Sequence, residues 1–100
     1  MTNILTDASI PSIFTNRAAF GAVVASATTI TPSAYRFHVS GTTPIATINL
    51  PEAGFKGDVV IVPDGAFTTT LAGNIGKAST AVVGVTLVMS FDGTKWYPSY

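Results

Sequence analysis

The chain contains no cysteine, which excludes disulfide bonds and thiolate-bound zinc. Charged residues are also scarce, at 10% of the 100 residues against about 25% in an average soluble domain. Five basic and five acidic residues give a formal net charge of +0 and form no basic cluster. Because nucleic acids and anionic membrane surfaces are bound through clustered lysine and arginine, the sequence predicts neither as a partner.

Long hydrophobic runs are absent too. The longest candidate, residues 18–27, is shorter than the roughly 20 apolar residues that a membrane-spanning helix requires. Asp7 stands where a secretory signal peptide needs positive charge, and Pro11 interrupts the apolar stretch, so we expect no signal peptide. The mean hydropathy is nevertheless +0.47. We expect the surplus apolar surface to be buried between subunits, because obligate interfaces resemble a domain core cut in half.

One hundred residues correspond to about one domain, and the character of the sequence changes near residues 28–33. We predict an N-terminal arm or short helix over residues 1–28 and a β domain over residues 29–100. Residues 14–27 are rich in alanine but lack a clean apolar stripe, so helix and extended arm stand as equal alternatives. Pro32 ends any helix before it, since proline disfavours helical geometry at the preceding residue.

From residue 34 onward the pattern is typical of β-strands. Tyr35, Phe37 and Val39 alternate with polar residues, as in a half-buried strand. Residues 45–50 and the apolar run 59–62 are further candidate strands, and proline follows each of them. We therefore predict a mainly β fold, specifically a compact antiparallel β-sandwich or barrel-like domain.

Residues 85–100 predict a β-hairpin. Asp92-Gly93 favours a two-residue type I′ turn, because both central residues of that turn need positive φ. This turn would align Met89 with Trp96 and place both in the core.

The second face of the hairpin is apolar as well. It carries Val88 and Tyr97, and residues 59–62 show the same two-faced pattern. A small sheet that is buried on both faces needs a partner on each side. A chain of this length has few residues left to cover the second face of the sheet, so we expect a homo-oligomer.

His38 is the only histidine. As a catalytic base it would need a nucleophile and an orienting acid, and no motif links it to either. As a metal ligand it lacks companions at useful spacing, unless a threefold axis brought three copies together. We predict a histidine on a solvent-facing or subunit-facing surface.

The carboxylates show no catalytic pattern. Asp64 and Asp92 precede glycine in predicted turns, where aspartate serves a structural role. Gly54–Gly57 lacks the Gly-Lys-Ser/Thr ending of a phosphate-binding loop. We therefore expect no catalytic residue, no cofactor and no metal site. The full set of carboxylates is Asp7, Glu52, Asp58, Asp64 and Asp92.

Three aromatic residues near the end of the sequence could fill a core, an interface or a ligand site. For Trp96 we predict the core. For Tyr97 and Tyr100, subunit contact and ligand contact are both open.

An ordered series of short motifs resembles a small β module of tailed-bacteriophage virions, over about residues 30–100. Such modules form the knobs of head fibres and tail fibres, and capsid cement or decoration proteins. The resemblance implies a trimeric, non-enzymatic protein with no catalytic residues to carry over. The motifs are Ser40–Thr43, Ile45–Ile48 with Pro51, Gly54-Phe55 with Gly57, Pro63–Thr70, Ala72–Ile75 and Asp92–Tyr97.

Because only a short segment precedes the module, the resemblance favours a compact cement protein over a long fibre. The expected function is a virion structural protein, assembled in the host cytoplasm, that stabilises the head as a homotrimer on the major capsid protein. Residues 1–28 would then grip the capsid or a neighbouring subunit. The alternative is a receptor-binding knob of a head or tail fibre, with Tyr97 and Tyr100 against a host-surface glycan.

Overall fold

The computed structural model describes residues 19–100, which form nine β-strands and no helix. The prediction of a compact, mainly β domain is confirmed. Within this range no helix is long and apolar enough to cross a membrane. The strands are β1 (Val24–Ala25), β2 (Thr29–Ile30), β3 (Arg36–Ser40), β4 (Thr47–Ile48), β5 (Gly57–Pro63), β6 (Thr68–Thr69), β7 (Ser79–Thr80), β8 (Leu87–Phe91) and β9 (Trp96–Pro98).

The main sheet has the order β1-β3-β5-β8-β9. Its pairing is mixed rather than antiparallel throughout: β1, β3 and β5 run parallel, whereas β5, β8 and β9 are antiparallel neighbours. Two smaller sheets accompany it, a parallel β2–β4 pair and an antiparallel β6–β7 pair. Among the described strands the main sheet has edges at β1 and β9, so it does not close into a barrel.

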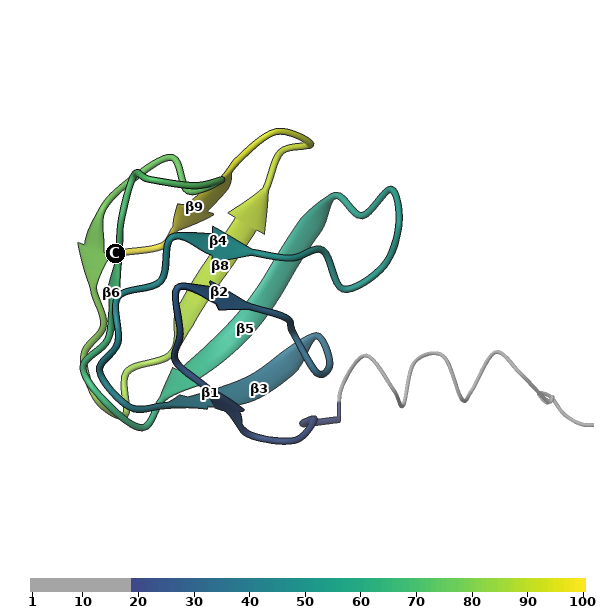
Figure 1. Ribbon diagram of the computed structural model, residues 1–100. Helices are drawn as coiled ribbons and strands as arrows, with labels where there is room; N and C mark the ends of the chain where they lie inside the picture. The colour runs from purple at the N-terminus through teal and green to yellow at the C-terminus, as the bar shows by residue number, and fades with distance from the viewer. Residues whose placement is uncertain (1–18) are drawn as a thin grey trace, which may run out of the picture.

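The parallel pairs arise because the chain winds between two layers. β1, β3 and β5 belong to the main sheet, and β2 and β4 fall between them in sequence and pair with each other. Each return to the main sheet therefore adds a strand that runs in the same direction. In Figure 1, β2 and β4 lie in front of β3, β5 and β8.

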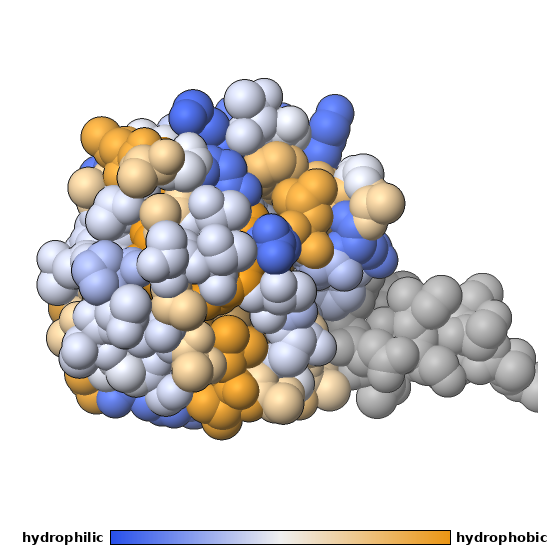
Figure 2. Space-filling model, viewed as in Figure 1, coloured by the Kyte–Doolittle hydropathy of each residue, from blue (hydrophilic) through white to orange (hydrophobic). Residues whose placement is uncertain are grey.

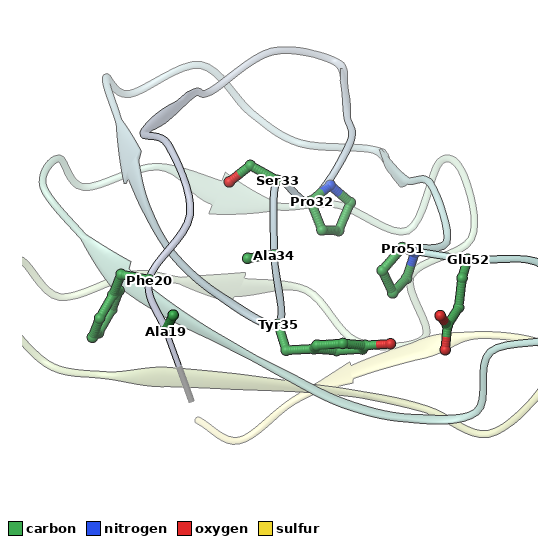
Figure 3. A pocket seen from close by; sticks show the side chains of 8 residues that line it. All are labelled: Ala19, Phe20, Pro32, Ser33, Ala34, Tyr35, Pro51 and Glu52. Atoms are coloured by element: carbon green, nitrogen blue, oxygen red, sulfur yellow. The ribbon is translucent and has the colours of Figure 1, made fainter. Parts of the chain in front are cut away.

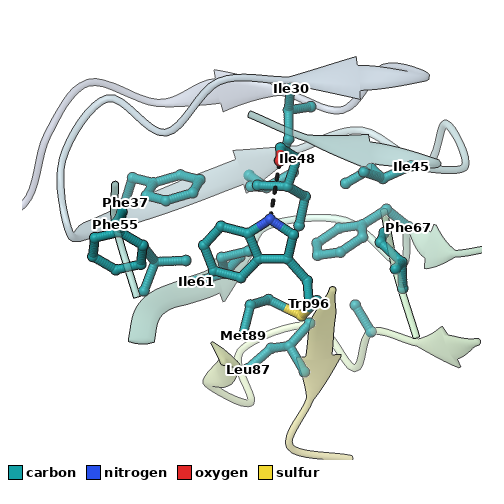
Figure 4. Close-up of a cluster of buried hydrophobic side chains, with 14 residues drawn as sticks. Ile30, Phe37, Ile45, Ile48, Phe55, Ile61, Phe67, Leu87, Met89 and Trp96 are labelled. Carbon is teal, nitrogen blue, oxygen red and sulfur yellow. Dashed lines mark hydrogen bonds between the residues drawn. The ribbon is translucent and has the colours of Figure 1, made fainter. Parts of the chain in front are cut away.

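The core fills the space between these layers (Figure 4). Alternate residues of β3, β5 and β8 point into it, as the period-two pattern predicts. Trp96 lies at its centre and is fully buried, which confirms the predicted core position. Its indole Nε1–H donates to the backbone oxygen of Ile48 at 2.9 Å, so its one polar group is satisfied. The buried apolar residues are Ile30, Phe37, Val39, Ile45, Ile48, Phe55, Val59, Ile61, Phe67, Ile75, Ala81, Leu87, Met89 and Trp96.

Asn74 joins the layers by hydrogen bonds. Its side-chain oxygen accepts from the amide of Ile48 at 2.9 Å, and its side-chain nitrogen donates to the Ile48 oxygen at 2.7 Å. Its backbone oxygen accepts from the amide of Trp96 at 2.8 Å. Asn74 thus links β4 of the second sheet to β9 of the main sheet.

The predicted hairpin exists, but the predicted register is wrong. Phe91 pairs with Trp96, and Met89 pairs with Pro98 instead of Trp96. The Asp92 amide bonds the Lys95 oxygen, so the two-residue turn is centred one position later, on Gly93 and Thr94.

The side chain of Asp92 accounts for this shift. Its Oδ1 accepts from the amides of Thr94 at 2.8 Å and Lys95 at 2.9 Å, which places Asp92 before the turn rather than in it. Moving a turn by one residue moves the pairing by two, so every side chain keeps its face.

Of the predicted N-terminal part, residues 1–18 lie outside the described range. Residues 19–28 are extended rather than helical, with Phe20 bridging Arg36 and Val24 paired with Val39. The segment therefore runs beside β3 at the edge of the main sheet. The domain boundary at residues 28 and 29 stays a prediction.

Candidate interaction surface

The main sheet has a second face that points away from the core. We define the outer sheet face by Val60, Val62, Val88 and Tyr97, which alternate with core residues along β5, β8 and β9. Val60 and Val88 are register partners, so their side chains are neighbours on this face. The valines are half-buried and Tyr97 is 43% exposed. The predicted two-faced apolar sheet is therefore present.

Polar and charged residues surround this apolar centre. Arg36 is the register partner of Val60, and His38 is the partner of Val62. Asp58 pairs with Ser90 at the other end of β5. An apolar centre with a polar rim is the usual anatomy of a protein–protein interface.

The opposite side of the domain has a different character. Figure 2 shows the side that carries β2 and β4, where residues of intermediate hydropathy dominate. The apolar patches visible there are separate from one another. The outer sheet face lies behind the domain in this view.

His38 and Asp64 form an ion-pair geometry at the edge of the outer sheet face. Nδ1 of His38 lies 2.8 Å from Oδ1 of Asp64, and both side chains are about two-fifths exposed. The ring of Phe20 packs against the imidazole with centroids 5.4 Å apart. At this exposure the pair contributes about 0–1 kcal/mol to stability.

His38 was predicted on a solvent-facing or subunit-facing surface, and its pairing with Asp64 was not predicted. The two residues are 26 positions apart and meet because β3 and β5 pair in parallel, with Val39 beside Pro63. Local sequence patterns carry no signal for that register.

The pair resembles the base and the orienting acid of a catalytic triad, which also requires a nucleophile. Among the described residues, Asp64 is the one hydrogen-bond partner of the His38 ring, so no hydroxyl nucleophile joins it. The arrangement orients the imidazole and leaves Nε2 available to a partner molecule. In residues 19–100, no group of three or more His, Cys, Asp or Glu side chains is placed to hold a metal ion.

A hollow of about 400 Å³ lies beside the start of β3 (Figure 3). The Tyr35 ring extends along one side with its hydroxyl directed toward Pro51 and Glu52, and Phe20 lies at the opposite end. No local sequence pattern indicates this hollow, because three separate segments of the chain contribute to it. The lining residues are Ala19, Phe20, Pro32, Ser33, Ala34, Tyr35, Pro51 and Glu52.

An apolar β-turn projects between β7 and β8, and we call residues Val82–Val85 the valine turn. The Val85 amide donates to the Val82 oxygen at 3.0 Å, and Gly84 has a φ of +78°, which favours glycine at this position. Val82, Val83 and Val85 are all exposed.

Tyr100 holds the valine turn in place. Its hydroxyl accepts from the Val82 amide at 3.0 Å and donates to the Val85 oxygen at 2.8 Å. The Gly84 amide adds a bond to the Pro63 oxygen at 3.0 Å, at the end of β5. Of the alternatives left open for the two C-terminal tyrosines, Tyr100 therefore has an internal role, while Tyr97 stays available for contact.

Comparison with known protein families, with curated proteins and with solved structures found no match to this chain.

Proposed function

We propose that this chain is a structural protein of a tailed-bacteriophage virion, a capsid cement or decoration protein that acts as a homotrimer on the major capsid protein. The ordered motifs of residues 30–100 suggest the class of protein. The observation that carries the proposal is the outer sheet face, whose apolar centre needs a covering partner.

The scarcity of charge supports burial of this surface. Val60, Val62 and Val88 form a contiguous strip across two strands, in a chain with only five cations and five anions. These valines are half-buried within the single chain, and an apolar strip surrounded by a polar rim is typical of an interaction site. A second and third copy of the same chain would cover the strip symmetrically.

The mechanism on this proposal is mechanical. A trimer seated across several capsid subunits adds buried area that must be lost before those subunits separate. Residues 1–28 provide the grip on the capsid or on the neighbouring subunit. Because the three N-terminal segments of a trimer are linked, binding of one raises the effective concentration of the other two at the capsid. Individually weak contacts therefore give a stable attachment.

The experiment compares the full chain with a variant that lacks residues 1–18. Light scattering measures the mass of each, and co-sedimentation with capsids assembled without this protein measures attachment. The proposal expects both proteins to be trimers and the shortened one to stay in the supernatant. A monomeric full chain contradicts the trimer, and a shortened chain that still sediments with capsids contradicts a grip by residues 1–18.

A second candidate is an adhesin that binds host-surface carbohydrate, and the exposed ring of Tyr97 favours it. Aromatic rings can stack on sugars, and Ser90 is the cross-strand neighbour of Tyr97, with Asp58 next to Ser90 on the following strand. Glycan-array binding that is lost on Tyr97→Ala would support this candidate. Retention of capsid binding by the same variant would favour the cement function.

A further inference from the structure

Ala19, where the described residues begin, lies at the rim of the hollow. Ala19 and Phe20 both line it, and the next residue is held by the sheet, since the Gly21 amide donates to the Arg36 oxygen at 2.8 Å. The segment approaches its neighbours this closely because residue 21 is glycine: a Cβ there would lie only 2.6 Å from Oγ of Ser33. Backbone contacts therefore fix the place of Ala19 beside the hollow.

The lining of the hollow suits a flat cation. Tyr35 supplies an aromatic ring, and Figure 3 shows its hydroxyl end directed toward Glu52. Phe55 braces the Tyr35 ring, with centroids 5.7 Å apart, and itself stacks on the buried Trp96. An arginine guanidinium binds aromatic faces and carboxylates with the same planar group. A site that offers both, within a wall of mixed polar and apolar side chains, favours arginine over a purely apolar occupant.

Glu52 is a carboxylate without a cation among residues 19–100. It is exposed and forms no ion pair within that range. Lys56 follows four residues later but lies against the hairpin turn, where its Cε would be 3.0 Å from a Cβ on Gly93. Arg36 belongs to the rim of the outer sheet face, beside Val60. The negative charge at the hollow is therefore left for a cation from outside the described residues.

We propose that the guanidinium of Arg17 occupies the hollow of its own chain, stacked on the Tyr35 ring and paired with the Glu52 carboxylate. Arg17 precedes Ala19 by two residues, so its Cα lies within about 7 Å of the Ala19 Cα. That distance brings the long arginine side chain within reach of the hollow. Because two peptide units join the occupant to the rim of its site, the effective concentration of the guanidinium there is high.

The contact fixes the point at which the N-terminal segment leaves the domain. Its consequence rests on the proposed function: residues 1–16 stay available to grip the capsid, and the three segments of a trimer start from defined positions. Preorganisation of this kind lowers the conformational cost of attachment. The contact itself lies within one chain and does not require the trimer.

Limited trypsin digestion of the full chain tests the contact, because trypsin must bind the Arg17 side chain in its own specificity pocket before it cleaves after this residue. Glu52→Gln should raise the rate of that cleavage by about two- to fivefold, the factor expected from loss of an exposed ion pair. The matched control is Asp58→Asn, which removes the same charge at the start of β5 and should leave the rate unchanged. Equal rates in wild type and Glu52→Gln overturn the proposal.

Nuclear Overhauser contacts test the stacking without altering the chain. Contacts between the side-chain protons of Arg17 and the ring protons of Tyr35 are expected in the wild-type protein. They should weaken in Glu52→Gln and at high salt, which screens an exposed ion pair. Their absence from the wild-type protein overturns the proposal.

A cysteine pair shows whose hollow Arg17 occupies, because the chain has no cysteine of its own. Arg17→Cys/Glu52→Cys should oxidise to a product of monomer mass on a non-reducing denaturing gel. Arg17→Cys/Leu71→Cys is the control and should keep its thiols free, since Leu71 is exposed on a turn that does not line the hollow. Covalent dimers or trimers in place of the monomer product would put Arg17 in a neighbour's hollow. That result, or equal oxidation of the control pair, overturns the inference.

The outcomes separate this inference from the proposed function. A wild-type chain that is monomeric by light scattering contradicts the proposed trimer and leaves the Arg17 contact intact. A wild-type trimer in which Glu52→Gln does not alter cleavage after Arg17 overturns the contact and leaves the trimer intact.

Discussion

The indole Nε1–H of Trp96 donates to the backbone oxygen of Ile48 across the buried core, at 2.9 Å and a sequence separation of 48 residues. The bond connects the last strand of the main sheet to β4 of the second sheet. The same Ile48 oxygen also accepts a hydrogen bond from the side-chain nitrogen of Asn74, so a single residue of β4 anchors two distant segments. Through this bond, β9 near the end of the chain and β4 near its middle contribute to the same core.

Loss of this bond should destabilise the domain. Trp96→Phe keeps an aromatic ring but leaves a gap and removes the donor, so the free energy of unfolding should fall by about 1–3 kcal/mol. Trp96→Ala should cost about 3–5 kcal/mol. Urea denaturation followed by circular dichroism measures both. A Trp96→Phe variant as stable as the wild type would contradict the anchoring role.

Tyr100→Phe should loosen the valine turn while preserving the fold. Each of the two hydrogen bonds of the hydroxyl contributes about 0.5–1.5 kcal/mol, and neither survives the substitution. Hydrogen exchange of the Val82 and Val85 amides should accelerate, and exchange in β5 should change little. Tyr97→Phe is the matched control, because the Tyr97 hydroxyl has no hydrogen-bond partner within residues 19–100. Equal exchange rates in both variants would count against the brace.

Asp92 should make the stability depend on acid pH. The backbone amides of Lys95 and Thr94 donate to its carboxylate and lower its pKa below the ordinary value of 3.8. A carboxyl with a lowered pKa contributes stability that is complete above the unfolded value and is lost as the pH falls through the folded value.

Asp92→Asn tests this dependence, since the amide oxygen still accepts a hydrogen bond but carries no charge. Wild-type protein should lose stability relative to Asp92→Asn as the pH falls from about 5 through 3.8 and below. Urea midpoints at several pH values give the comparison. Parallel pH profiles of the two proteins would show that the turn bonds do not depend on the charge.

On the proposed homotrimer, Val88→Asp should separate the subunits without unfolding them. Val88 points away from the core and is half-buried, so the charge falls on the outer sheet face and is desolvated further when another copy covers it. Light scattering should show a lower mass for this variant. Thr80→Asp, at an exposed position of β7, should behave as the wild type. An unchanged mass for Val88→Asp would place the subunit contact elsewhere.

The sequence predicted the strands better than their partners. Alternation around Phe37 and Val39 identifies β3, because side-chain period depends only on local backbone geometry. Its parallel pairing with β5 depends on how β4 crosses to the second layer, which no local pattern encodes. The pairing of His38 with Asp64 follows from that crossover and was therefore not predictable.

The register of the C-terminal hairpin was likewise not predictable from local sequence. Asp92-Gly93 correctly indicates a tight turn, but two adjacent positions can hold its centre. The carboxylate of Asp92 decides between them by bonding two amides beyond Gly93. Similarly, three exposed valines in sequence give no sign that Tyr100 braces them, because the tyrosine is 15 residues beyond Val85.

Electron microscopy of an assembled particle that contains this protein tests the central claim most directly. The proposed function predicts threefold-symmetric densities on the capsid surface, each the size of three copies of this 10.3 kDa chain. Density for the protein on the tail alone would contradict a capsid cement protein.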